Sequence, residues 1–363
     1  MTGVELSERF FREAVRVALR RDSPGLLDSV SAAIMGDGSE VLGFDDAISH
    51  DHNFSPRVLL LMDDAEYDRA GPALAERLRG SLPAEFEGFT LLNQEYRKAV
   101  EVVPLHRHFH NYLGLAALPE KDLDWLRCDE QRLLELTSGK VFHDPGGRLA
   151  ALRTGLAHYP PAVRLFLLRL CFVRMSESAG IERAIRRNDA VATSYYTNWF
   201  SYFAIRACHL LENRYCPYHK WMGRSLERTG EFGRLMHDLV LALLSARTGD
   251  ATRGAMLAIL HRLSARVLHE LGLPASEATS PDSLILLDFD WESVLKPLKE
   301  RLPVELKALS PLVSPPAYAG MLFDYSGFDA TYRQVMEDNV RLTADNSQLT
   351  ANSPQPEQEQ SRT

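Results

Sequence analysis

This 363-residue chain has no long apolar run, and its four cysteines form no Cys-x-x-Cys pair. Charged residues interrupt each apolar stretch well before the roughly 20 residues that a membrane-spanning helix needs. The N-terminal stretch MTGVELSERFFREAVRVALRR mixes acidic and basic residues, which predicts an amphipathic helix and not a signal peptide. We therefore expect no membrane contact, reduced thiols and a cytoplasmic location.

An excess of positive charge is also missing. Lysine and arginine total 41 against 49 aspartates and glutamates, which gives a formal net charge of −8. An extended nucleic-acid surface needs many cations to neutralise phosphates, so this balance argues against a nucleic-acid partner. A small-molecule or protein substrate fits better. A single nucleotide site is still compatible with this composition, because it needs only local charge.

Apolar periodicity divides the chain into two parts. In the first part, residues 51–62, 86–92 and 97–103 have the pattern of strands, and residues 65–82 that of a helix with a kink at Pro72. From His106 onward helical periodicity dominates. We expect an α+β fold, with a small mixed sheet and its helices in residues 1–110 and a larger all-α part in residues 111–344. Residues 345–363 are polar and rich in Pro, Gln and Ser, so we expect disorder there.

The stretch between residues 38 and 62 carries the clearest motif. A Gly38-Ser39 pair is followed, after a loop rich in small and acidic residues, by Asp51-His52-Asn53 and then by an apolar run at residues 58–62. This order resembles the beginning of the active site in polymerase-β-type nucleotidyltransferases, where a Gly-Ser turn precedes an Asp-x-Asp pair and a strand. The resemblance implies a fold of that type for the N-terminal part.

The resemblance also implies a role for each of these residues. Nucleotidyl transfer requires a positioned and neutralised triphosphate, and Mg²⁺ held by carboxylates supplies the neutralising charge. Side chains at i and i+2 of a strand share one face, so Asp51 and Asn53 would hold the metal together. Gly38 and Ser39 would bind phosphate oxygens. The implied ligands are Mg²⁺ and a nucleoside triphosphate, with ATP as the first candidate.

Two more residues complete the candidate site. Glu101 is an acid in an otherwise apolar strand, and we interpret it as a third metal ligand or general base. The alternative is an edge-strand carboxylate that faces water. Lys220 follows Pro217 at an expected helix start and could reach the triphosphate as a cation. The alternative there is a packing turn along which the lysine stem lies.

A longer set of residues spans both parts of the chain. It comprises GSEVLGFDD at 38–46, Ser49, Asp51-His52, GKVFHD at 139–144, Arg153, Tyr159-Pro160 and RYCPYHKW at 214–221. Together these residues are similar to a bacterial family, frequent in actinobacteria, in which a nucleotidyltransferase-like domain precedes a helical domain of unknown function. The family has Asp-His-Asp where this chain has Asp51-His52-Asn53. The Asn removes one negative charge from the metal site, and Asp45 and Asp46 are the nearest acids that could replace it.

Three alternating histidines form a further candidate. His106, His108 and His110 would share one face of a strand and could bind a metal. If a helix begins there, the three side chains do not converge.

Two functions therefore remain open. The first is a metal-dependent enzyme that transfers a nucleoside monophosphate from a nucleoside triphosphate to a small-molecule or protein acceptor. The second is a degenerate nucleotidyltransferase fold that binds nucleotide, or nothing, and acts on a partner through its helical part. Asn53 favours the second. The first requires Asp51, Asn53 and Glu101 to converge beside the Gly38-Ser39 turn.

Overall fold

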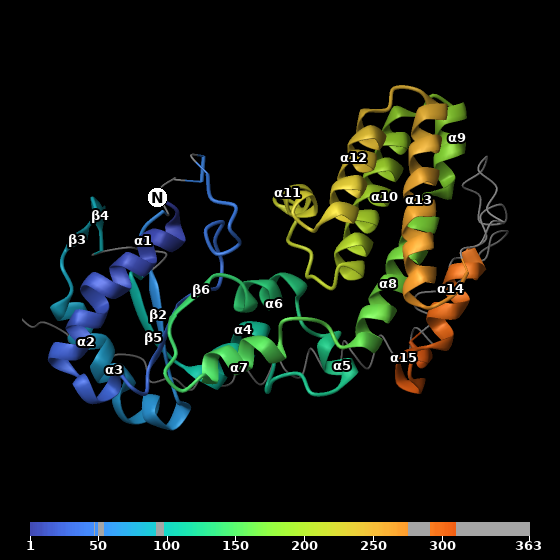
Figure 1. Cartoon of the computed structure of the whole chain (residues 1–363). Coiled ribbons are helices and arrows are strands. Elements are labelled where there is room, and N and C mark those ends of the chain that lie inside the picture. Colours follow the sequence, from blue (N-terminus) through green and yellow to red (C-terminus); the bar gives the residue numbers. More distant parts are fainter. Residues whose placement is uncertain (47, 50–53, 92–97, 275–290, 310–363) are drawn as a thin grey trace, which may run out of the picture.

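The computed structural model describes residues 1–46, 48–49, 54–91, 98–274 and 291–309. Two predicted site residues, Asp51 and Asn53, lie outside these ranges, as does the predicted disordered tail at 345–363. The chain places a sheet with its helices at one end and a bundle of long helices at the other (Figure 1). This is an α+β fold with a small mixed sheet and a mostly helical remainder, as the sequence predicts.

The main sheet has four strands in the order β5-β2-β1-β6. They are β1 (Ser31–Ile34), β2 (Val58–Met62), β5 (Val100–Pro104) and β6 (Lys140–His143). Strand β2 runs parallel to β5 and antiparallel to β1, and β6 pairs antiparallel with the other edge of β1. A separate hairpin joins β3 (Glu85–Phe86) to β4 (Phe89–Thr90).

Each face of the sheet packs against its own helices, because alternate strand residues point to opposite faces. On one face, Val58, Leu60 and Met62 join a core with Phe10 and other residues of the N-terminal helices. These helices are α1 (Gly3–Phe10), the π-helix η1 (Phe11–Val15), α2 (Arg16–Asp22), the 3-10 turn η2 (Pro24–Leu26) and α3 (Asp64–Ser81). On the other face, Ala33 and Leu61 pack with residues of α4 (Leu105–Leu113) and α6 (Glu130–Thr137).

The helical part continues this second core. Its long helices α8, α10, α12 and α13 stand side by side, and α4, α6 and α7 lie between them and the sheet (Figure 1). No helix in the described ranges combines the length and apolarity required to span a bilayer. The bounds are α5 (Asp122–Trp125), α7 (Arg148–Gly155), α8 (Pro161–Ser176), η3 (Glu177–Gly180), α9 (Ile181–Arg186), α10 (Ala190–Leu211), α11 (Met222–Glu227), α12 (Glu231–Ser245), α13 (Gly249–Glu270), α14 (Trp291–Glu300) and α15 (Val304–Ala308).

Several predicted elements differ in extent from the observed ones. Helix α3 begins at Asp64, directly after its N-cap residue Asp63, whose carboxylate accepts a hydrogen bond from the Ala65 N–H. The helix continues through Pro72. A strand was predicted over residues 51–62. Among the described residues of this range, the strand begins at Val58. Strand β6 was not predicted, and it lies beyond residue 110, where the N-terminal part was expected to end. The sheet therefore takes its fourth strand from the region expected to be helical.

Candidate functional site

A pocket of about 140 Å³ lies where β1 ends and where β2 and β5 begin. We call it the strand-end pocket. It is bounded on one side by the turn that follows β1 and on the other by helix α4. Its polar lining residues are Asp37, Arg57, Lys98, Glu101, His108 and Tyr112.

Glu101 reaches this pocket because of the register of the sheet. It pairs with Leu59 across the parallel β2–β5 ladder, so the two side chains lie on the same face. That face packs against α4 and carries the turn after β1. β5 is an edge strand, as the alternative interpretation supposed, but Glu101 is only half exposed and lines the pocket.

Arg57 connects the start of β2 to the turn after β1. Its Nε donates to Glu40 Oε1 over 3.0 Å, and its Nη1 lies 3.6 Å from Asp37 Oδ1. The Arg57 side chain is 14% exposed and that of Glu40 10%, so solvent screens this pair weakly. The pair fixes the turn against β2, at the mouth of the strand-end pocket.

The Gly38-Ser39 turn lies next to the pocket without lining it. Gly38 has φ +131°, and a Cβ there would lie 2.5 Å from both carboxylate oxygens of Glu40. The positive φ therefore favours glycine at this position, and a larger residue would also have to displace the Glu40 carboxylate. The Ser39 hydroxyl is half-buried and makes no hydrogen bond within the described part of the chain.

Helix α4 contributes His108 and Tyr112 to the wall of the pocket. Burial lowers the pKa of His108 to about 4, so the ring is neutral near pH 7. The Tyr112 hydroxyl donates to Glu135 Oε2 over 2.6 Å, and burial raises the pKa of that phenol. The three histidines stand on a helix, so they do not converge; within the described residues no group of three His, Cys, Asp or Glu side chains could hold a metal.

Lys220 lies in a different contact between the two parts of the chain. Its Nζ is 4.9 Å from the Trp221 ring centre, and Trp221 stacks on Phe44 with centroids 5.2 Å apart. Phe44 belongs to the loop that follows the Gly38-Ser39 turn. Lys220 is exposed beside this loop and does not line the strand-end pocket. The packing turn that we considered as the alternative is thus present, with Trp221 buried.

Asp45 and Asp46 have structural partners in the same loop. Asp45 Oδ2 accepts the Gly3 N–H over 2.8 Å. Asp46 Oδ2 accepts from Arg224 of α11 over 2.9 Å, and this hydrogen bond, together with those from Ser49, lowers the Asp46 pKa to about 2. Both carboxylates therefore fasten the loop, one to the N-terminal helix and one to the helical part.

Most of the residues in this pocket were not predicted from the sequence. Among its polar residues Glu101 was predicted as a site residue and His108 was considered as a metal ligand, whereas Asp37, Arg57, Lys98 and Tyr112 were not predicted. A usable signal existed for two of them. Arg57 directly precedes the apolar run of β2, and Lys98 stands three positions before Glu101. Charges that flank buried strands at the same sheet end are candidates for one site.

Comparisons with known proteins give two similarities. Residues 125–222 match a family described as a domain of unknown function, DUF4037. This range contains the residues from Gly139 to Trp221 in the resemblance above, and it does not reach Gly38. A nucleotidyltransferase-like protein from Exiguobacterium sibiricum has a crystal structure that is similar over 70% of this chain and 76% of its own, at 12% identity and a TM-score of 0.35. No curated protein matches.

Proposed function

We propose that this chain is a metal-dependent nucleotidyltransferase-like protein. It binds a nucleoside triphosphate, ATP being the first candidate, at the strand-end pocket. It transfers the nucleoside monophosphate to a small-molecule or protein acceptor. The observation that carries this proposal is that Glu101 shares one pocket with the turn after β1, directly before Gly38-Ser39.

The charges around the pocket support a phosphate ligand. Lys98 is exposed at the pocket, and Arg57 places its guanidinium beside the turn that follows β1. The Ser39 hydroxyl has no hydrogen-bond partner among the described residues and is half-buried, so it is available to a phosphate oxygen. At about 140 Å³ the pocket accommodates part of a nucleotide, and the remainder would extend beyond it.

The lining residues also fit one divalent cation. Mg²⁺ is held by one or two carboxylates together with substrate phosphates, and Asp37 and Glu101 line the same pocket. Asp51 and Asn53 are proposed to complete the ligand set. When bound, Mg²⁺ would neutralise charge on the phosphate oxygens.

The proposed reaction is a nucleotidyl transfer. An acceptor oxygen forms a bond to the α-phosphorus, the bond from that phosphorus to the bridging oxygen breaks, and pyrophosphate leaves. Glu101 would hold the cation with one carboxylate oxygen, and its other oxygen accepts the proton that the acceptor hydroxyl loses. Lys98 offsets negative charge on the triphosphate from the start of β5. Lys220 lies outside the strand-end pocket, so it would act only on the part of the nucleotide that extends beyond the pocket.

A second function has an observation of its own. Asn53 stands where an acid would strengthen metal binding, and the nearby acids Asp45 and Asp46 are engaged in fastening the loop. These features favour a degenerate binding module that acts through its helical part.

Turnover separates the two functions. The protein is incubated with Mg²⁺, labelled nucleoside triphosphates and a cell extract as the source of acceptors, and pyrophosphate release is measured. We expect release by the wild type and none by Asp51→Asn. The exposed Asp250 lies on the surface of α13, so Asp250→Asn is the matched control. Release that survives Asp51→Asn would contradict the site, and absence of release with intact nucleotide binding would favour the binding module.

A further inference from the structure

A second pocket, of about 350 Å³, lies entirely within the helical part. We call it the aromatic pocket. It is bounded by the start of α6, by α8 and α10, and by the segment before α11. Every residue that lines it falls in the range 125–222, which matches the domain of unknown function. Its volume is within the range of small-molecule sites, and it does not share a lining residue with the strand-end pocket.

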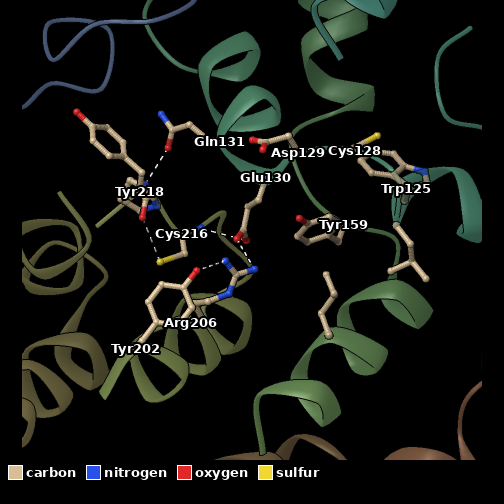
Figure 2. Close-up of a pocket in the computed structure, with 13 residues that line it drawn as sticks. Trp125, Cys128, Asp129, Glu130, Gln131, Tyr159, Tyr202, Arg206, Cys216 and Tyr218 are labelled. Carbon is tan, nitrogen blue, oxygen red and sulfur yellow. Dashed lines mark hydrogen bonds and ion pairs between the residues drawn. The ribbon is translucent and has the colours of Figure 1, made fainter. Parts of the chain in front are cut away.

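A charged pair is built into the wall of the aromatic pocket. Arg206 Nη2 lies 2.7 Å from Glu130 Oε2, and the Cys216 N–H donates to Glu130 Oε1 over 3.2 Å. The Glu130 side chain is only 9% exposed. Figure 2 shows Glu130 and Arg206 facing each other from α6 and α10, with Tyr159 across from them. The guanidinium and the carboxylate are therefore engaged with each other, so an anionic ligand would compete with Glu130 and a cationic ligand with Arg206.

Two oxygen atoms in this wall make no hydrogen bond with the described residues. Despite its contact with Arg206, Glu130 Oε2 accepts no hydrogen bond from any described residue. The Tyr159 hydroxyl lines the pocket and has no hydrogen-bond partner in the described part of the chain. A buried carboxylate oxygen is normally hydrogen-bonded, so Glu130 Oε2 and the neighbouring hydroxyl point to a ligand that carries donors.

The charge and the ring faces define that ligand further. The lining contains two carboxylates, those of Asp129 and Glu130, and one guanidinium, that of Arg206. Their charges sum to an excess of one negative charge. Four aromatic residues complete the wall: Trp125, Tyr159, Tyr202 and Tyr218. Aromatic faces attract both rings and cations, and a carboxylate attracts a protonated amine.

We propose that the aromatic pocket binds a small organic amine, namely a ring compound that carries a protonated amino group. The amino group donates to Glu130 Oε2 and to the Tyr159 hydroxyl, and the ring packs among the aromatic side chains. This site does not depend on nucleotide transfer at the strand-end pocket.

Benzylamine and benzyl alcohol test the proposal, because they have the same ring and differ in the charged group. Calorimetric titration of the full chain measures both affinities. Indole signals of ¹⁵N-labelled tryptophan locate the site, with Trp125 assigned through Trp125→Phe. We expect benzylamine to bind at least about tenfold more tightly than benzyl alcohol and to shift the Trp125 signal.

Variants then test the assigned groups. Glu130→Gln should abolish the preference for the amine, and Tyr159→Phe should weaken benzylamine binding severalfold. Glu120→Gln, at an exposed position, should change neither. Equal affinity for the two compounds, binding that leaves Trp125 unshifted, or no binding of benzylamine at millimolar concentration would overturn the proposal. The comparison of the two compounds on the wild type requires no variant to fold.

Discussion

The Tyr112 hydroxyl donates a 2.6 Å hydrogen bond to Glu135, and this contact joins the wall of the strand-end pocket to helix α6. The same glutamate accepts from Gln131 Nε2 over 2.8 Å, and Gln131 Oε1 accepts from the Tyr218 N–H over 2.9 Å. Gln131 and Tyr218 line the aromatic pocket. Helix α6 therefore carries a continuous chain of hydrogen bonds from one pocket to the other.

Tyr112→Phe tests the first contact of this chain. The substitution keeps the ring and removes the only donor that the tyrosine offers to the half-buried Glu135 carboxylate. We expect the free energy of unfolding to fall by about 1–2 kcal/mol. Urea denaturation measures it. Tyr195→Phe is the matched control, since that tyrosine is 59% exposed, and an equal loss in both variants would contradict this role for the hydroxyl.

Gly139→Ala tests the junction of β6 with β1. Gly139 has φ +76°, and an added Cβ would lie 2.1 Å from the Ile34 carbonyl oxygen, which the backbone cannot move aside cheaply. Gly147 has a similar φ of +67° with open space around it. We expect Gly147→Ala to lose about 1 kcal/mol of stability from backbone strain and Gly139→Ala to lose at least about 3 kcal/mol. Similar losses in denaturant titrations would show that β6 does not approach β1 in this way.

The sequence predicted those parts of the fold that local pattern determines. Strand β2 and helix α3 follow from an apolar run and from capped helical periodicity, and Glu101 stood out because it interrupts an apolar strand. Strand β6 was missed because KVFH is short and lies between helical segments, so only its pairing with β1 defines it. Lys98 and Tyr112 reach the strand-end pocket through the parallel β2–β5 register and the packing of α4, which no local pattern reports.

The alternating histidines show the same limit. The spacing left two alternatives, a strand with the three rings on one face and a helix that separates them, and the backbone after Pro104 is helical, as expected from His106 onward. Of the three, His108 alone reaches the pocket, as a half-buried neutral ring. The assignment of Asp51 and Asn53 stays a prediction, since both lie outside the described residues.

Stability should decrease in mild acid because of His209. This residue is fully buried in α10, its Nδ1 lies 2.9 Å from the Ile205 carbonyl and its Nε2 2.9 Å from the Ser225 hydroxyl. Burial lowers its pKa from 6.5 to about 4. His209 therefore takes up a proton at higher pH in the unfolded chain than in the folded chain. Its contribution to the free energy of unfolding is fully present above the pKa of the unfolded state and declines as the pH falls toward the pKa of the folded state.

The measurement compares unfolding free energies at about pH 7.5 and pH 5. His209→Gln should reduce the difference between the two by roughly 1 kcal/mol or more, since each unit of pKa difference is worth about 1.4 kcal/mol. His219→Gln, at an exposed position, should leave the difference as it is in the wild type. An unchanged difference in His209→Gln would rule out this source of acid sensitivity.

Lys98→Met tests the proposed phosphate contact. Lys98 is exposed and makes no ion pair with another described residue, so its loss should leave the stability of the fold unchanged. We expect the affinity for ATP in the presence of Mg²⁺ to fall about tenfold. Lys299→Met, on the exposed side of α14, is the control. Equal affinities in the two variants, measured by fluorescence with a labelled ATP, would remove Lys98 from the site.

The central claim is that Glu101 holds a divalent cation together with a nucleoside triphosphate. The most direct test is a calorimetric titration of ATP, with and without Mg²⁺, into the wild type and Glu101→Gln, with Glu120→Gln as the control at an exposed position. We predict that Mg²⁺ strengthens ATP binding in the wild type and the control and that this gain is lost in Glu101→Gln. The same Mg²⁺-dependent gain in all three proteins, or no ATP binding by any of them, would contradict the claim.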